Sequence, residues 1–204
     1  MKIKLTKGEL KKQRDALKQF LRYLPTLQLK KQQLQLEILQ QQNLLEEKKR
    51  QETKKKEAVK IWAGLIPESQ EGLAKWLVPQ AVVTQTKNVA GVNLPVYKHT
   101  DFAEAEYDLF TTPLWVDFAV EALRNLVSLE KEIEVLQEAS NVLKHELRIT
   151  TQRVNLFEKI KIPETSKAIH LIKIYIGDQM ANAVGRSKIA KRKIEAMVFE
   201  GAVV

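Results

Sequence analysis

The sequence predicts a mainly α-helical protein: a long antiparallel two-helix coiled coil with a small α/β tip that contains a short β-hairpin. Composition is the first reason, because aromatic residues make up 6% of the 204 residues and charged residues 29%, with seven Gly and six Pro. This balance is typical of long helices with large solvated faces. The other reasons are apolar repeats of seven residues in the first and last parts of the chain, and β-prone runs between them.

Residues 1–62 are predicted to form the first long helix. One column of the seven-residue repeat contains Leu10, Leu17, Leu24, Lys31, Ile38, Leu45, Glu52 and Val59, and the second contains Gln13, Phe20, Leu27, Leu34, Gln41, Lys48, Lys55 and Trp62. Two such columns are too narrow to be a wall of a globular core and instead form the seam of a coiled coil. At 1.5 Å per residue the helix is about 85 Å long, and Gly64 with Pro67 beyond it favours an end near residue 64.

Pro25 interrupts this helical pattern. A proline inside a helix removes one backbone hydrogen bond and costs about 3 kcal/mol, so Pro25 either kinks one helix or separates two. The apolar stripe keeps its phase from Leu24 to Leu34, which favours a kink. Pro163 raises the same question of a kink or a break in the last helix.

Residues 63–112 are predicted to form the tip. The segment 67–77 has the pattern of a short helix, and the runs 81–86 and 94–97 are rich in residues that favour strands. Turn-forming residues at 88–91 lie between these runs, so we expect a β-hairpin.

Residues 113–204 are predicted to form the second long helix, with Thr112 as its N-cap and Pro113 as its first residue. Its two columns contain Leu126, Ile133, Ser140, Leu147 and Val154, and Leu129, Leu136, Leu143, Thr150 and Phe157. The phase slips around residues 160–163 and resumes at Ile162, Ile169, Ile172 and Ile176. If the chain folds back at the tip, each seam covers the other, and both termini lie together at the far end.

The residue types present favour no catalytic, cofactor or metal site. There is no cysteine, and no two of the three histidines have the spacing of metal ligands. The sequence contains no Gly-rich phosphate loop and no nucleophile motif. A run of 18 apolar residues is also missing, so we expect a cytoplasmic protein that does not insert into the membrane.

The net charge of +9 is concentrated in the first helix, because residues 1–62 carry 17 basic and 7 acidic side chains. Such an excess suits nucleic acid, an anionic membrane surface or an acidic protein channel. The aromatic residues that usually accompany nucleic-acid binding are not interleaved with the basic ones. A coiled-coil scaffold or nucleic-acid-binding protein remains the alternative function.

Several segments resemble the D subunit of V/A-type ATPases, a group that includes V-ATPases and archaeal-type ATP synthases. The resemblance is spread over most of the chain, in residues 5–7, 22–30, 88–95, 153–158 and 162–163 and in the basic stretch near residue 190. It implies a central rotor shaft that transmits torque between ATP turnover in the ring of catalytic A and nucleotide-binding B subunits and ion movement through the membrane ring. The resemblance also implies that the shaft itself is not an enzyme and holds no cofactor.

The resemblance also implies partners and contact residues. The end that carries the termini enters the A/B ring, and the tip meets the F subunit and the socket subunit on the c-ring, which makes the protein a peripheral part of the soluble V1/A1 sector. The expected ring contacts are the basic residues Lys7, Lys11, Arg186, Lys188, Lys191, Arg192 and Lys193. The expected tip motif is Asn88, Val89, Ala90, Gly91, Val92, Leu94 and Pro95.

Overall fold

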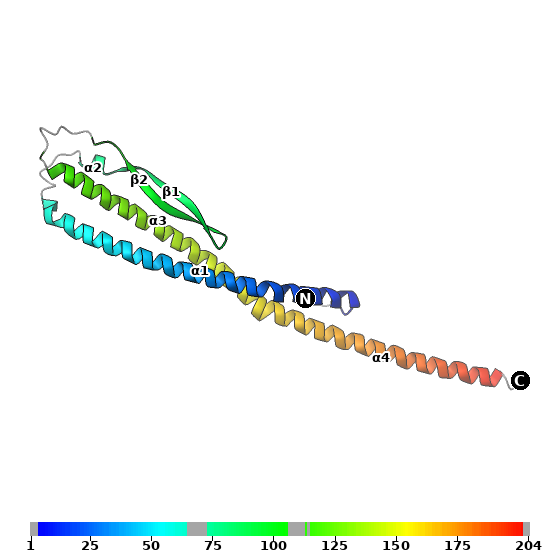
Figure 1. The fold of residues 1–204 in the computed structure, drawn as a ribbon. Coiled ribbons are helices and arrows are strands. Elements are labelled where there is room, and N and C mark those ends of the chain that lie inside the picture. The colour runs from blue at the N-terminus through cyan, green and yellow to red at the C-terminus, as the bar shows by residue number, and fades with distance from the viewer. Residues whose placement is uncertain (1–3, 65–72, 106–112, 114, 202–204) are drawn as a thin grey trace. The chain divides into compact units, whose positions relative to one another are not determined.

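The fold is that of a computed structural model, which describes residues 4–64, 73–105, 113 and 115–201. The chain divides into two compact units, one formed by residues 30–150 and the other by residues 1–29 together with 151–204. Each unit contains a stretch of the N-terminal helix and a stretch of the C-terminal helical run (Figure 1). The prediction of a mainly helical protein with a small hairpin is confirmed.

Helix α1 (Lys7–Trp62) begins at a side-chain cap and runs through Pro25 without ending. The Thr6 hydroxyl accepts a hydrogen bond from the backbone N–H of Glu9 (3.2 Å), which satisfies one of the donors that a helix start leaves without a partner. Next to the proline, the Thr26 hydroxyl donates to the carbonyl of Tyr23 (2.8 Å). A boundary between two helices at Pro25 is therefore excluded.

The stripe predicted along α1 is the face that packs. Every residue of the first column is at least partly shielded from solvent, and so is every residue of the second column except Lys55. Leu34 and Ile38 are buried. The seam also takes in polar residues of the two columns, whose long aliphatic stems can cover apolar surface while their charged ends stay in water.

The second helical run consists of α3 (Trp115–Asn155), a π-helix (Leu156–Lys161) and α4 (Ile162–Gly201). Its predicted columns are buried or half-buried from Leu126 to Phe157. It runs antiparallel to α1: in the unit 30–150, Lys30 pairs with Glu146 and Lys48 with Glu132. Thr112, the predicted N-cap, lies outside the described residues.

The π-helix explains why the seven-residue phase slips near residue 160. A π-turn holds one more residue than an α-turn, so the seam passes from Val154 to Ile162 in eight residues and then resumes. Pro163 follows directly; it has no N–H, and its ring would collide with the carbonyl four residues earlier in a regular α-helix. The Thr165 hydroxyl donates to the carbonyls of Lys161 (2.7 Å) and Ile162 (3.0 Å), and the helix continues through the proline.

Between the long helices lie a short helix and a β-hairpin, both in the unit 30–150. Helix α2 (Leu73–Trp76) is the described part of the predicted helix 67–77; residues 67–72 lie outside the described residues. Strands β1 (Pro79–Val89) and β2 (Val92–Phe102) form an antiparallel two-stranded sheet. The strands are longer than predicted, because the polar residues that extend each strand lack the apolar alternation by which a strand is recognised in sequence.

The hairpin turn does not lie at the bend between the long helices, where the sequence predicts the tip. Leu94, next to the turn, is buried in a cluster with Leu34 and Ile38 of α1 and Ala139 and Leu143 of α3. Leu34 lies 28 residues before the end of α1, which is about 42 Å along the helix. The turn of the hairpin thus lies along the two helices and not at the bend between them.

Candidate functional site

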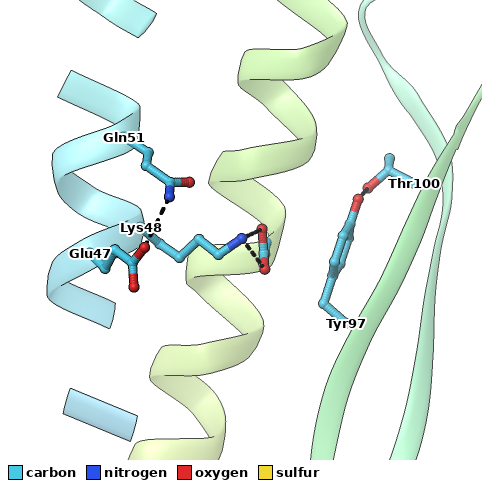
Figure 2. Close-up of polar contacts among 6 residues, drawn as sticks. Glu47, Lys48, Gln51, Tyr97 and Thr100 are labelled. Atoms are coloured by element: carbon cyan, nitrogen blue, oxygen red, sulfur yellow. Dashed lines mark hydrogen bonds and ion pairs between the residues drawn. The ribbon is translucent and has the colours of Figure 1, made fainter. Parts of the chain in front are cut away.

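Three lysines of α1 tie the helix to acidic residues of α3 in the unit 30–150. Lys30 contacts Glu146 (3.0 Å), Lys48 contacts both carboxylate oxygens of Glu132 (2.8 and 2.9 Å), and Lys56 contacts Glu130 (2.9 Å). Figure 2 shows Lys48 reaching from α1 to the carboxylate on α3, beside the bond between Tyr97 and Thr100 of β2. These pairs flank the apolar seam and set the antiparallel register of the two helices.

Lys56 has two carboxylate partners. Its ammonium donates to Glu52, one turn earlier on α1 (2.5 Å), and to Glu130 on α3 (2.9 Å). The hydrogen bond to Glu52, followed by that to Glu130, raises the pKa of Lys56 above its ordinary value. The Lys56 side chain is 46% exposed, so solvent screens these pairs and their contribution to stability is small.

The turn of the hairpin has a defined backbone geometry. Ala90 (φ 50°) and Gly91 (φ 77°) both have positive φ, which identifies the two-residue type I′ turn that suits the twist of β-hairpins. The side chain of Asn88 donates to that of Asn93 (2.7 Å) and accepts from the Gly91 N–H (3.2 Å). The turn predicted at 88–91 is thus present, and its polar residues hold it closed.

The predicted tip motif divides into a packed part and a polar part. Leu94 is buried, and Val89, Ala90 and Val92 pack against the same cluster. Asn88 and Gly91 are exposed, while Pro95 is half-buried. The motif residues are therefore brought together, and their apolar members attach the turn to the coiled coil.

Arg124 of α3 holds the base of the hairpin segment, and sequence reasoning missed it. Its guanidinium donates to the carbonyls of Trp76 (3.1 Å) and Ala103 (2.6 Å) and lies over the ring of Phe102 (5.4 Å to the centroid). These partners come just before β1 and at the end of β2. A basic residue in a helix carries no sequence signal for such contacts, because they depend on where the tertiary fold brings two distant carbonyls.

An apolar groove lies where α1 ends and α3 begins. It has a volume of about 500 Å³ and is lined mainly by Trp62 of α1 and by Trp115, Phe118, Ala119 and Ala122 of α3. The Phe118 side chain is 76% exposed. The groove belongs to the unit 30–150 and offers an apolar surface beside the bend.

The predicted ring-contacting residues are split between two places in the other unit. Gln13 and Ala16 of α1 share a groove with Thr165 and Ala168 of α4, so antiparallel pairing brings the start of α1 level with about residue 175. All residues from 177 to 197 except Gly185 are exposed. The two termini, which we expected to lie together, are outside the described residues; within the described part, α4 continues beyond the start of α1 (Figure 1).

The seven basic residues predicted to contact the ring are exposed. Lys7 and Lys11 lie at the start of α1. The other five, Arg186, Lys188, Lys191, Arg192 and Lys193, lie on the continuation of α4. Lys191 contacts Glu195 at 3.7 Å with both side chains largely in solvent, so this helix presents an excess of positive charge to its surroundings.

Metal-binding clusters and membrane-spanning helices are both missing from the described part of the chain. Within it, three or more His, Cys, Asp or Glu side chains nowhere gather closely enough to bind a metal ion. The same residues include no helix that combines the length and the apolar character needed to span a membrane.

Comparison with known proteins gives one consistent result. Residues 9–192 match the family model for the D subunit of ATP synthase. The chain is 44% identical to the V-type ATP synthase D subunit of Borreliella burgdorferi over 193 residues, 95% of each chain. It is 34% identical to the V-type ATP synthase D subunit of Chlamydia pneumoniae, over 98% of this chain and 97% of the relative. The chain belongs to the family of ATP synthase D subunits.

Proposed function

We propose that this chain is the central-stalk rotor subunit of a V-type ATP synthase. It transmits torque between ATP turnover in the ring of A and B subunits and ion translocation through the membrane ring. It performs no catalysis of its own and holds no cofactor. Family membership supports its place in the complex, and the paired helices support the mechanical role.

The observation that carries the proposal is the shielded seam that α1 shares with the second helical run in each unit. Both columns of α1, from Leu10 to Trp62 with Lys55 as the exception, are at least half-buried along one face. Interlocking side chains along a long seam resist twisting of one helix against the other. The pairs Lys30–Glu146 and Lys48–Glu132 further oppose sliding in the unit 30–150.

The proposal assigns partners to the exposed surfaces. The continuation of α4, with Arg186, Lys188, Lys191, Arg192 and Lys193, enters the A/B ring, and Lys7 and Lys11 lie at its entrance. The F subunit binds the surface that includes the hairpin motif. The apolar groove at Trp62 and Trp115 faces the socket subunit on the c-ring. The protein is then a peripheral component of the soluble V1 sector.

The experiment uses a single introduced cysteine, because the chain has none of its own. Ser187→Cys places a thiol on the exposed basic stretch of α4, where Ser187 bonds only locally, to the carbonyl of Ala183 (2.9 Å). A second cysteine is placed on the inner surface of a B subunit. Oxidation of the assembled complex should form a disulfide and stop ATP turnover, and a reductant should restore it.

The control complex carries Ser187→Cys without the cysteine in B, and oxidation should leave its turnover unchanged. If the crosslinked complex hydrolyses ATP at the uncrosslinked rate, the chain does not rotate against the ring and the rotor role is wrong. A failure to form the disulfide at every position tested along the inner surface would contradict insertion of α4 into the ring.

A further inference from the structure

The two edges of the hairpin sheet are not equivalent, and one of them is open. Within the described residues the sheet has two strands, so each strand has one edge with no other described strand beside it. Exposed edges can accept another strand, and natural proteins usually block them with proline, charged side chains or bulges. The question is which edge of this hairpin carries such devices.

The register decides where each backbone group points. Val89 and Val92 flank the two-residue turn, and hydrogen-bonded pairs then alternate along the ladder. Thr84, Thr86 and Asn88 belong to the non-hydrogen-bonded pairs of the ladder. Their backbone N–H and C=O groups therefore point away from β2. The bond between the side chains of Asn88 and Asn93 agrees with this assignment, because side chains lie closest in those pairs.

The outer edge of β2 is blocked at its centre. The residues whose backbone groups point outward from β2 are Asn93, Pro95 and Tyr97, the partners of Asn88, Thr86 and Thr84. Pro95 has no N–H to offer, and β2 bears Lys98, His99 and Asp101 further along. A register shift then interrupts this ladder opposite Val83 and Thr84.

The outer edge of β1 lacks these devices between Thr84 and Val89. All five residues from 84 to 88 are exposed, they include no proline, and Lys87 is their one charged residue. The paired register is unbroken over this stretch. Its three outward-facing residues offer a full set of donors and acceptors at every second position.

We propose that the outer edge of β1, from Thr84 to Asn88, binds an extended strand of another subunit of the V-type ATP synthase complex by β-sheet addition. The strand pairs with the outward N–H and C=O groups of Thr84, Thr86 and Asn88 and places an acidic residue beside Lys87. A second copy of this chain is the less suitable occupant, since each copy carries a net charge of +9. The inference rests on the chain's place in that complex.

The test is amide hydrogen exchange resolved to single residues, in the isolated chain and in the intact complex purified from cells. In the isolated chain the amides of Gln85, Lys87 and Val89 should be protected and those of Thr84, Thr86 and Asn88 should exchange freely. In the complex these three should slow by about fivefold or more, the factor that one net hydrogen bond contributes. Asn93 and Tyr97, on the outer edge of β2, are the internal control and should stay fast.

A proline variant separates strand addition from other contacts. Thr86→Pro removes an outward donor and leaves the ladder intact, so the slowing at Thr84 and Asn88 should be lost while Gln85 and Lys87 stay protected. Lys87→Pro removes an inward donor and should open the hairpin even in the isolated chain. The inference is overturned if the complex forms with the β1 amides unprotected, or if amide exchange slows equally at the outer edges of β1 and β2. Either result leaves the rotor proposal standing. Absence of the chain from the complex overturns both proposals.

Discussion

At the residue scale, polar side chains make specific contacts that hold the long helices and the hairpin in place. Thr6 caps α1, Thr165 binds two carbonyls after the π-helix, and Arg124 joins both ends of the hairpin segment to α3. Thr6 and Arg124 satisfy backbone groups that a helix start and the ends of the hairpin segment leave without a partner, and the Thr165 hydroxyl adds bonds to two carbonyls next to Pro163. Such contacts specify register and attachment more than they add to overall stability.

Lys56 gives a prediction about pH at this scale. Its pKa is raised in the folded chain by Glu52 and Glu130, so folding favours the charged lysine. The charged Lys56 side chain therefore makes its full contribution to the free energy of unfolding below the unfolded pKa of about 10.4. That contribution is lost as the pH rises through the higher pKa of the folded chain. Lys56→Met should lower the free energy of unfolding by less than about 1 kcal/mol, because the pair is exposed.

The measurement is the difference in melting temperature between the parent and Lys56→Met at several pH values. The difference should stay constant between about pH 6 and 9 and shrink above about pH 10.4. Lys54→Met is the matched control, a nearby exposed lysine that should show a smaller difference. A parent–variant difference that disappears below pH 9 would contradict the assignment of the shift to Lys56.

At the element scale, the π-helix accommodates two features of the sequence. One is an extra residue in the seven-residue apolar repeat, and the other is Pro163. The insertion alone would rotate the apolar face of α4 away from α1, and the proline alone would collide with the turn before it. A single wide turn at Leu156–Lys161 accommodates both. The two causes are therefore separable by mutation.

We predict the outcome of combining two changes. Deleting Lys159, an exposed residue in the π-helix, restores a strict seven-residue repeat but places Pro163 in a regular helix, and should lower stability by up to about 3 kcal/mol. Adding Pro163→Ala to the deletion should recover stability to the parent level or above. Denaturant unfolding of the parent, both single variants and the double variant measures this coupling.

A deletion where the repeat is regular provides the comparison. Removing the exposed Lys144 of α3 shifts all later seam residues by one position. This deletion should destabilise the chain whether residue 163 is Pro or Ala. If the double variant at 159 and 163 were as unstable as the Lys144 deletion, the π-helix would not arise from the inserted residue and the proline.

At the scale of the whole molecule, the distribution of charge and of unpaired surface is what suits the chain to a larger assembly. Residues 177–197 of α4 are exposed almost throughout, with Ile189, Ile194 and Met197 more than 60% exposed. An isolated helix with apolar side chains in water is marginally stable, so we expect this segment to gain its stability from partners.

The proposed insertion into the ring gives a prediction for the basic residues of that segment. Changing Arg186, Lys188, Lys191, Arg192 and Lys193 together to Gln should weaken binding to the A/B ring and reduce its salt dependence, because exposed charge pairs are screened by salt. Each pair contributes about 0–1 kcal/mol, so single substitutions should have little effect. The helicity of the isolated chain should not change, since the seam is untouched.

A variant with the same change in charge elsewhere is the control. Lys49, Arg50, Lys54, Lys55 and Lys60 are five exposed basic residues of α1, and their replacement by Gln should leave ring binding and its salt dependence nearly as in the parent. Equal effects of the two variants on ring binding, measured across a salt series, would mean that net charge and not the α4 segment is responsible.

The two long helices, the residues of their seam, the phase slip near residue 160 and the hairpin turn were all determined by the sequence. Each is a local or periodic property, and a seven-residue apolar repeat admits few other structures. The family could also be recognised from the sequence, because segments that resemble it are spread along the chain. Gly91 is the residue type that suits positive φ in the turn, whereas Ala90 (φ 50°) is not, and it packs against the cluster around Leu34.

The tertiary structure alone decided where these elements lie against one another. The hairpin turn packs along the helices against Leu34 and Leu143. Arg124 binds the carbonyls of two residues that are far apart in the sequence. Helix α4 extends beyond the start of α1. A seven-residue apolar repeat predicts which face of a helix is buried. It does not predict the position of each turn along the axis of the paired helix. That offset depends on side-chain packing and on ion pairs between residues about a hundred positions apart, such as Lys30 and Glu146.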